Sequence, residues 1–234
     1  MKLLAVDTST WVESVAVLDN GDLLAEKVVL VRETHNRRLL ETIDKTISDA
    51  GISLKDIDLF AVGVGPGSFT GIRIGITTVK ALAWSLNKPI IGISSLDALA
   101  TLFSFVQGYV CPMIDARKRE VYYALYEADG SGRLRRESFY KVATPRIVAQ
   151  EITEKGIKKV FFCGDGWRIY KDYFLQFLNC TIIDPPGVFN SVKASFIGAS
   201  AWQSLVSGVS PSSSFELVPI YVRPSEAELK RGTS

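Results

Sequence analysis

Hydrophobic and polar positions change their spacing several times along the first hundred residues. Short apolar or alternating runs predict strands, and the Asn20-Gly21 pair between two of them is typical of a hairpin turn. Apolar residues three and four positions apart predict helices. The expected elements, in order, are strands at 3–6, 12–18 and 22–31, a helix at 34–50, a strand at 58–64, a helix at 71–86, a strand at 89–93 and a helix from Ser95.

A second series of elements begins near Tyr109 and follows the same order. Thr144 before Pro145 predicts a helix start, because proline fits the first turn of a helix. The expected elements are strands at 109–114, 120–127 and 134–142, a helix at 145–155, a strand at 158–163, a helix to Leu178, a strand at 181–183 and a helix at 191–207.

Two halves that both open with three strands and continue with alternating helices and strands indicate an internal duplication of a β-β-β-α-β-α unit. This topology is typical of the actin-like (ASKHA, ribonuclease H-like) α/β fold, in which two lobes enclose a cleft. The order of elements alone leaves another α/β fold open. We expect an N-terminal lobe at 1–106, a smaller C-terminal lobe at 107–190, and a C-terminal helix and tail at 191–234 that packs back between the lobes.

Composition narrows the functional classes only slightly. The net charge of +2 creates no large field, so nucleic-acid binding does not follow from composition. Cys111, Cys163 and Cys180 are far apart and form no CxxC pair, which argues for reduced thiols in a cytoplasmic protein rather than a zinc knuckle or disulfides. We expect no signal peptide and no membrane span, because no apolar stretch reaches roughly 20 residues.

The most specific motif is the glycine-rich run GVGPGSFTGIRIG at residues 63–75, between a predicted strand and a predicted helix. Glycine lets a second chain segment approach closely, and a turn before a helix points backbone N–H groups at any ligand above it. The run is therefore either an anion-binding loop or a close-packing surface. It lacks the Lys-Ser/Thr of a P-loop and the spacing of a dinucleotide-binding turn.

Several polar residues are candidates for chemistry, and each has a structural alternative. The turn 7–9 ends the first strand, where actin-like kinases bind phosphate and magnesium. It lacks the glycine that usually follows the aspartate, and its structural alternative is a cap of the turn. Arg117-Lys118-Arg119 is either solvated surface or a contact for RNA phosphates or an acidic partner. The possible nucleotide-contacting residues are Asp7, Thr8, Ser9, Gly65 and Gly67.

A metal site is not expected, and no catalytic residue is predicted. His35 is the single histidine, and Leu39 stands four residues after it, so no pair of histidines shares a helical face. His35 is then a polar residue at the start of the first helix.

Taken together, the motifs resemble those of the TsaB (YeaZ) family. The glycine-rich run is highly specific, and the weaker matches follow it in the same order along nearly the whole chain. These matches are LAVDTS at 4–9, His35 ahead of Leu39-Leu40, IDAR at 114–117 followed by EVY at 120–122, GDGW at 164–167 and PIYVR at 219–223.

The resemblance implies an actin-like fold and a role in transferring threonylcarbamoyl to the adenosine 3′ of the anticodon in tRNAs that read ANN codons. In such a system a TsaD-type paralogue holds a metal through histidines and catalyses the transfer, and a TsaE-type ATPase joins the complex. A protein like this one is the non-catalytic subunit. The family also forms homodimers. The resemblance further suggests tRNA contact through the complex and no tightly bound cofactor, with ATP or ADP at a complex interface.

The first two helices are the expected partner surface. Their apolar and small residues would pack against an equivalent pair in a four-helix interface with a second copy or with the paralogue, or else only inside the lobe. The predicted interface residues are His35, Leu39, Leu40, Ile43, Ile47, Gly71, Ile74, Gly75 and Thr78. The alternatives to a binding subunit are an actin-like ATP-dependent phosphotransferase and a glycoprotease-like peptidase.

Overall fold

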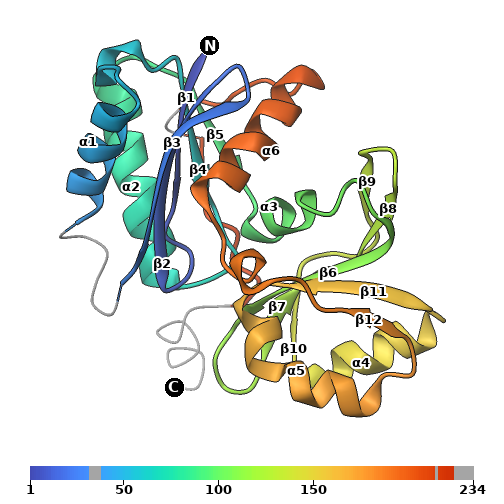
Figure 1. Ribbon diagram of the computed structural model, residues 1–234. Helices are drawn as coiled ribbons and strands as arrows, with labels where there is room; N and C mark the ends of the chain where they lie inside the picture. The colour runs from blue at the N-terminus through green and yellow to red at the C-terminus, as the bar shows by residue number, and fades with distance from the viewer. Residues whose placement is uncertain (32–37, 214–215, 224–234) are drawn as a thin grey trace.

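The computed structural model describes residues 1–31, 38–213 and 216–223, and it contains two lobes that are each built on one sheet (Figure 1). The first sheet has the order β3-β2-β1-β4-β5. Its strands are β1 (Lys2–Asp7), β2 (Val12–Asp19), β3 (Asp22–Leu30), β4 (Leu59–Gly63) and β5 (Ile90–Ile93). Strands β1, β2 and β3 pair antiparallel as consecutive hairpins, and β1, β4 and β5 are parallel.

The second sheet repeats this arrangement. Its main path has the order β10-β7-β6-β11-β12, in which β6 takes the central place that β1 has in the first sheet. The strands are β6 (Gln107–Asp115), β7 (Val121–Tyr123), β8 (Tyr126–Asp129), β9 (Leu134–Arg136), β10 (Lys141–Ala143), β11 (Lys159–Cys163) and β12 (Thr181–Ile183). The mixed parallel and antiparallel pairing confirms the predicted duplicated α/β topology.

Alternating side chains distribute the core over the two faces of the first sheet. Leu4 and Val6 face the helices α1 (Leu39–Asp49) and α2 (Phe69–Ser85), whereas Leu3 and Ala5 face the opposite side. That opposite side is covered by α6 (Ala194–Val206), which packs across β1, β2 and β4 (Figure 1).

The central core joins the two lobes. Helix α3 (Ser95–Thr101) lies against both α6 and β6, and one cluster of buried side chains contains residues of both sheets. Helices α4 (Pro145–Glu154) and α5 (Asp165–Phe177) cover the outer face of the second sheet, where Trp167 stacks on Phe162. The lobe boundaries expected at residues 106 and 190 stay predictions.

Two predicted strands of the second lobe are each two strands in the structure. The run at 120–127 divides into β7 and β8, which pair with different parts of β6: Tyr123 lies opposite Met113 and Tyr126 opposite Val110. Ala124 and Leu125 between the two strands are buried and apolar like the strands themselves, so the bend is invisible in the apolar pattern. The run at 134–142 likewise divides into β9, which pairs with β8, and β10, which pairs with β7.

The helix starts also differ from the sequence predictions. Helix α2 begins at Phe69, two residues before the predicted start, because the Ser68 hydroxyl accepts the backbone N–H of Gly71 at 3.2 Å and caps the helix. Helix α1 begins at Leu39, and the predicted start at residue 34 lies outside the described residues, as does His35. Within the described ranges, no helix has the length and hydrophobicity needed to cross a membrane.

Candidate functional site

The glycine-rich run packs against the turn that follows β1. A Cβ atom on Gly67 would lie 2.3 Å from the Ser9 carbonyl oxygen, and one on Gly71 would lie 2.0 Å from the Thr8 carbonyl oxygen. A Cβ on Gly75 would lie 2.4 Å from Thr8 Oγ1. Real Cβ atoms do not approach so closely, so these positions require glycine for close contact within the first lobe.

The turn itself is buried and internally hydrogen-bonded. Ser9 donates its backbone N–H and its hydroxyl to Asp7 Oδ1, at 3.1 and 2.9 Å. The Thr8 hydroxyl donates to the Gly71 carbonyl at 2.7 Å, and the Ser68 N–H donates to the Ser9 carbonyl at 2.7 Å. The turn is therefore held by hydrogen bonds within itself and to the glycine-rich run.

The second lobe has an equivalent turn after β6. Asp115 ends β6 as Asp7 ends β1, and Asp115 Oδ1 accepts the backbone N–H of Arg117 at 3.0 Å, the same contact that Asp7 makes with Ser9. The backbone N–H of Asp115 donates in turn to Asp165 Oδ1 at 3.0 Å. Asp165 stands at the start of α5. Because both aspartates accept the N–H of the residue two positions later, the duplication extends to the local geometry of the two turns.

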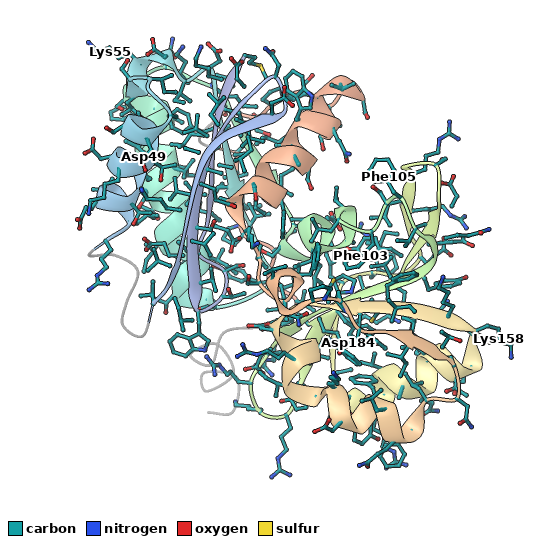
Figure 2. All side chains as sticks on the ribbon, in the orientation of Figure 1. Asp49, Lys55, Phe103, Phe105, Lys158 and Asp184 are labelled. Carbon is teal, nitrogen blue, oxygen red and sulfur yellow. The ribbon has the colours of Figure 1, made fainter. Side chains whose placement is uncertain are left out.

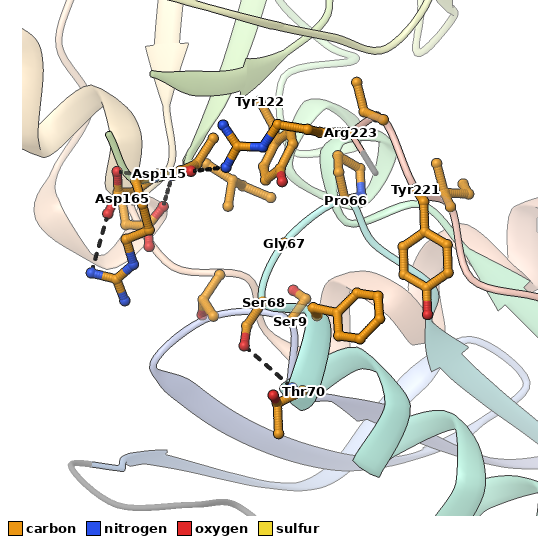
Figure 3. A pocket seen from close by; sticks show the side chains of 18 of the residues that line it. Ser9, Pro66, Gly67, Ser68, Thr70, Asp115, Tyr122, Asp165, Tyr221 and Arg223 are labelled. Atoms are coloured by element: carbon orange, nitrogen blue, oxygen red, sulfur yellow. Dashed lines mark hydrogen bonds and ion pairs between the residues drawn. The ribbon is translucent and has the colours of Figure 1, made fainter. Parts of the chain in front are cut away.

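The two turns face each other across a cavity of about 410 Å³ between the lobes (Figure 3). The first lobe contributes residues 9–11 and 66–71, and the second lobe contributes residues 114–117. The C-terminal segment 220–223 forms a further wall. Of the predicted nucleotide-contacting residues, Ser9 and Gly67 line this cavity, whereas Asp7, Thr8 and Gly65 lie behind the lining.

Asp165 is the most perturbed ionisable group of the cavity. Burial raises the pKa of its carboxyl to about 6, and the N–H groups of Asp115 and Gly166 offset part of that rise. The cavity offers hydroxyls, carboxylates and two guanidinium groups for hydrogen bonding. None of its described lining residues is a histidine or a cysteine, so the described lining provides no histidine-activated or cysteine nucleophile.

The C-terminal segment connects both lobes at the cavity. Ile220 donates its N–H to the Val64 carbonyl at 2.8 Å, and Tyr221 stacks on Phe69 at a centroid distance of 5.0 Å. Arg223 reaches the second lobe, where it donates to the Ala116 carbonyl at 2.8 Å and forms an ion pair with Glu120. In the sequence this motif is one of the matches to the family, and its contacts with both lobes were not predicted. The sequence signal that could have indicated these contacts is the arginine after the extended, mostly apolar run at 219–222.

The predicted partner helices have most of their apolar residues inside the lobe. Leu39, Ile43 and Ile47 lie in the core between α1, α2 and the sheet. Gly71 and Gly75 contact Thr8, as described above, and Ile74 and Thr78 are half-buried. Leu40 is the predicted α1 residue that lies on the surface, with 61% of its area exposed.

The exposed side of the helix pair contains an aromatic residue that the sequence analysis did not select. Trp84, near the end of α2, is 68% exposed and shares this side of the helix with Thr77 and Ala81. A tryptophan on the polar side of a helix was the signal that could have identified it. Within the described ranges, no group of three or more His, Cys, Asp and Glu side chains is placed to hold a metal ion.

Solved structures with this architecture define the class of protein. YeaZ from Pseudomonas aeruginosa superposes with a TM-score of 0.77 at 29% identity, over 94% of this chain and 99% of that one. An inorganic polyphosphate/ATP-glucomannokinase from Arthrobacter sp. strain KM superposes with a TM-score of 0.55 at 13% identity, over 88% and 99% of the two chains, which shows the shared fold. The molecule is thus an actin-like α/β protein.

Sequence relatives identify the family. The family model described as TsaD, tRNA N6-adenosine threonylcarbamoyltransferase, matches residues 29–230. The tRNA threonylcarbamoyladenosine biosynthesis protein TsaB of Bacillus subtilis (strain 168) is 37% identical over 236 residues, which cover 98% of this chain and 97% of the relative. The chain belongs to the TsaB family, as the motifs predict.

Proposed function

We propose that this chain acts in tRNA threonylcarbamoyladenosine biosynthesis as a non-catalytic subunit. In this role it binds a TsaD-type paralogue that transfers threonylcarbamoyl to the adenosine 3′ of the anticodon in tRNAs reading ANN codons. The observation that carries the proposal is the likeness to TsaB over nearly the whole length of both chains. A TsaE-type ATPase and a second copy of the chain are its further proposed partners.

The residues of the two turns support a binding role over phosphotransfer. The Ser9 and Thr8 carbonyl oxygens lie where Cβ atoms of Gly67 and Gly71 would be, which supports close packing of the glycine-rich run over its use as an anion-binding loop. The chain also has a single histidine. The proposed metal-dependent step therefore belongs to the paralogue, and ATP or ADP is proposed only at an interface of the complex.

The exposed side of α1 and α2 is the proposed protein-binding surface. Leu40 and Trp84 offer apolar area that water covers in the isolated chain. A two-fold contact between such helix pairs forms a homodimer, and the same contact with the structurally similar paralogue forms a heterodimer. We propose that these two assemblies compete for one surface.

An omission assay tests the proposed function. The paralogue, the adenylate-forming enzyme, the ATPase, tRNA, ATP, threonine and bicarbonate are combined with and without this protein, and modified adenosine is counted. We expect modification only when this protein is present, and none from this protein alone. Equal modification without it would refute the subunit role, and ATP turnover by the isolated chain would then favour the phosphotransferase alternative.

Surface variants test the proposed interface. Trp84→Glu should weaken both self-association and binding to the paralogue in sedimentation measurements, because it places a charge in an apolar contact. Phe139→Glu is the matched control, since Phe139 is 87% exposed on the other lobe. Loss of only one of the two assemblies in Trp84→Glu would show that they use separate surfaces.

A further inference from the structure

The hairpin turn between β6 and β7 has an unusual backbone. Arg117, Lys118 and Arg119 are three successive residues with φ values of 63°, 52° and 62°. A left-handed conformation costs a residue with a Cβ atom roughly 1–2 kcal/mol, so such residues persist only where the surrounding structure imposes them. Backbone conformations of this kind concentrate at functional sites.

The contacts around the turn impose this conformation. The Ala116 N–H donates to the Glu120 carbonyl at 3.0 Å, and the Glu120 N–H donates to the Arg117 carbonyl at 2.9 Å. Arg223 holds the same turn from outside, through the Ala116 carbonyl and an ion pair with Glu120. The result is a rigid loop whose three cationic residues are all exposed to solvent.

An aromatic side chain from the other lobe adjoins the first of these cations, Arg117, which also forms an ion pair with Asp115 at 3.5 Å. Trp11, in the turn after β1, is 49% exposed, and the guanidinium of Arg117 lies 4.8 Å from the centroid of its ring. Cations beside an exposed aromatic ring form the combination that binds nucleic-acid backbones and unstacked bases. Both residues line the mouth of the interlobe cavity, so the surface spans the two lobes.

We propose that Trp11 and the loop Arg117–Lys118–Arg119 form a contact surface for the phosphate backbone of tRNA. The inference rests on the proposed function, which supplies RNA as the substrate of the complex. Phosphate groups complement the exposed cations, and the rigid loop loses little conformational freedom on binding.

The position of this surface is compatible with simultaneous protein binding. The cavity lies at the start of α2, where Ser68 and Phe69 belong to its lining, whereas Trp84 lies near the other end of the helix. Trp84 lies 15 positions after Phe69, which corresponds to about 22 Å along the helix axis at 1.5 Å per residue. RNA at the β6–β7 turn therefore leaves the Trp84 end of the proposed protein-binding surface accessible.

Binding of a labelled, unmodified tRNA transcript to the complex with the paralogue, measured over a range of KCl concentrations, tests the proposal. The double variant Lys118→Gln/Arg119→Gln should bind on the order of tenfold more weakly, and the slope of log affinity against log salt should fall by roughly 1.5. Trp11→Ala should weaken binding on the order of fivefold without changing this slope, because it removes stacking and no charge.

The matched control is Lys155→Gln/Lys158→Gln, which removes the same charge. Lys158 precedes β11 at the far end of the second lobe (Figure 2), and β11 runs parallel to β6, so it lies at the opposite edge of the sheet from the β6–β7 turn. The proposal would be overturned if the Lys118/Arg119 double variant bound RNA with the affinity and salt slope of the unaltered protein. It would also be overturned if the two double variants had equal effects.

The omission assay tests the proposed function separately from the proposed RNA surface. Modification supported by the unaltered protein, together with normal RNA binding by the double variant, would refute only the RNA surface. If no complex with the paralogue forms, the same titrations are run on the chain alone. Absence of RNA binding by the chain alone would then refute the surface as well.

Discussion

The turns after β1 and β6 occupy equivalent places in the two halves of the molecule and are stabilised in opposite ways. In both, an aspartate at the strand end accepts the N–H of the residue two positions later, at 3.1 Å in the first lobe and 3.0 Å in the second. The first turn is buried against glycines 67, 71 and 75. The second is exposed and held by Arg223 and Glu120.

This difference shows how one backbone motif can be adapted to two tasks. The first turn depends on the absence of side chains on its neighbours, so the backbone of residues 8 and 9 packs directly against the glycine-rich run. The second turn depends on hydrogen bonds and an ion pair, and residues 117–119 are exposed. The first lobe thus has the tightly packed turn, and the second lobe has the exposed cationic one.

Adding one methyl group to the first turn should give the largest effect. Gly71→Ala should lower the free energy of unfolding by about 3 kcal/mol, because its Cβ would meet the Thr8 carbonyl oxygen at 2.0 Å. Urea unfolding measures this change. Gly187→Ala is the control, since no atom lies within 4 Å of its added Cβ. A stabilised Gly71→Ala protein, as helix propensity alone predicts, would contradict the close-packing account.

Removing each aspartate compares the two turns directly. Asp7→Ala should cost about 2 kcal/mol, because it leaves the buried N–H and hydroxyl of Ser9 without their acceptor. Asp115→Ala should cost about 1 kcal/mol, since Asp115 is only half-buried and water reaches the Arg117 N–H. Equal costs in urea unfolding would mean that burial does not distinguish the turns.

The pH dependence of stability tests Asp165, the buried carboxyl that accepts the N–H of Asp115 beside the second turn. Asp165 binds its proton more tightly in the folded state, with a pKa of about 6 against the usual 3.8. The stability gained by protonation is therefore present at low pH and is lost as the pH rises from about 4 to about 6. We expect this loss to be about 1.5 kcal/mol, because solvent reaches the cavity and reduces the effect of burial.

Asp165→Asn is the reference protein for this measurement, because asparagine keeps an acceptor oxygen for the Asp115 N–H and does not ionise. Unfolding of both proteins is followed between pH 3.5 and pH 7. A constant difference in unfolding free energy across that range would show that Asp165 has an ordinary pKa.

Replacing one left-handed residue should give the smallest effect. Lys118→Gly should raise the free energy of unfolding by about 0.5 kcal/mol, since relief of the left-handed conformation exceeds the greater flexibility of glycine in the unfolded chain. Lys155, at the end of α4, has an ordinary φ of −72°. Lys155→Gly should therefore lower the free energy of unfolding by a similar amount. Thermal unfolding of both variants should therefore shift in opposite directions.

Much of the first lobe could be predicted from the chain because its signals are local. The Asn20-Gly21 hairpin and the short apolar strands β1 and β2 follow directly from the pattern of residues. The bend between β7 and β8 could not be predicted, because Ala124 and Leu125 are fully buried and continue the apolar run. Only pairing with the two ends of β6 divides that run into separate strands.

The candidate sites were less predictable than the fold. The glycine-rich run left open whether it binds an anion or packs closely, since the same residues serve both purposes. Its packing partner is the turn 7–9, more than fifty residues away. The sequence of neither segment indicates that the two are in contact. In the same way, Leu40 and Ile43 are alike in sequence, and only the position of the sheet makes one exposed and the other buried.

The sequence by itself determined the order of strands and helices, the duplication and the family, because these depend on periodicity and on specific local motifs. The tertiary structure alone decided which residues face the cavity, the core and the solvent. The physical reason is that close contact and burial depend on pairs of segments far apart in the chain. Arg223 beside Ala116 and Arg117 beside Trp11 are examples, and their proximity arises only when the two lobes pack together.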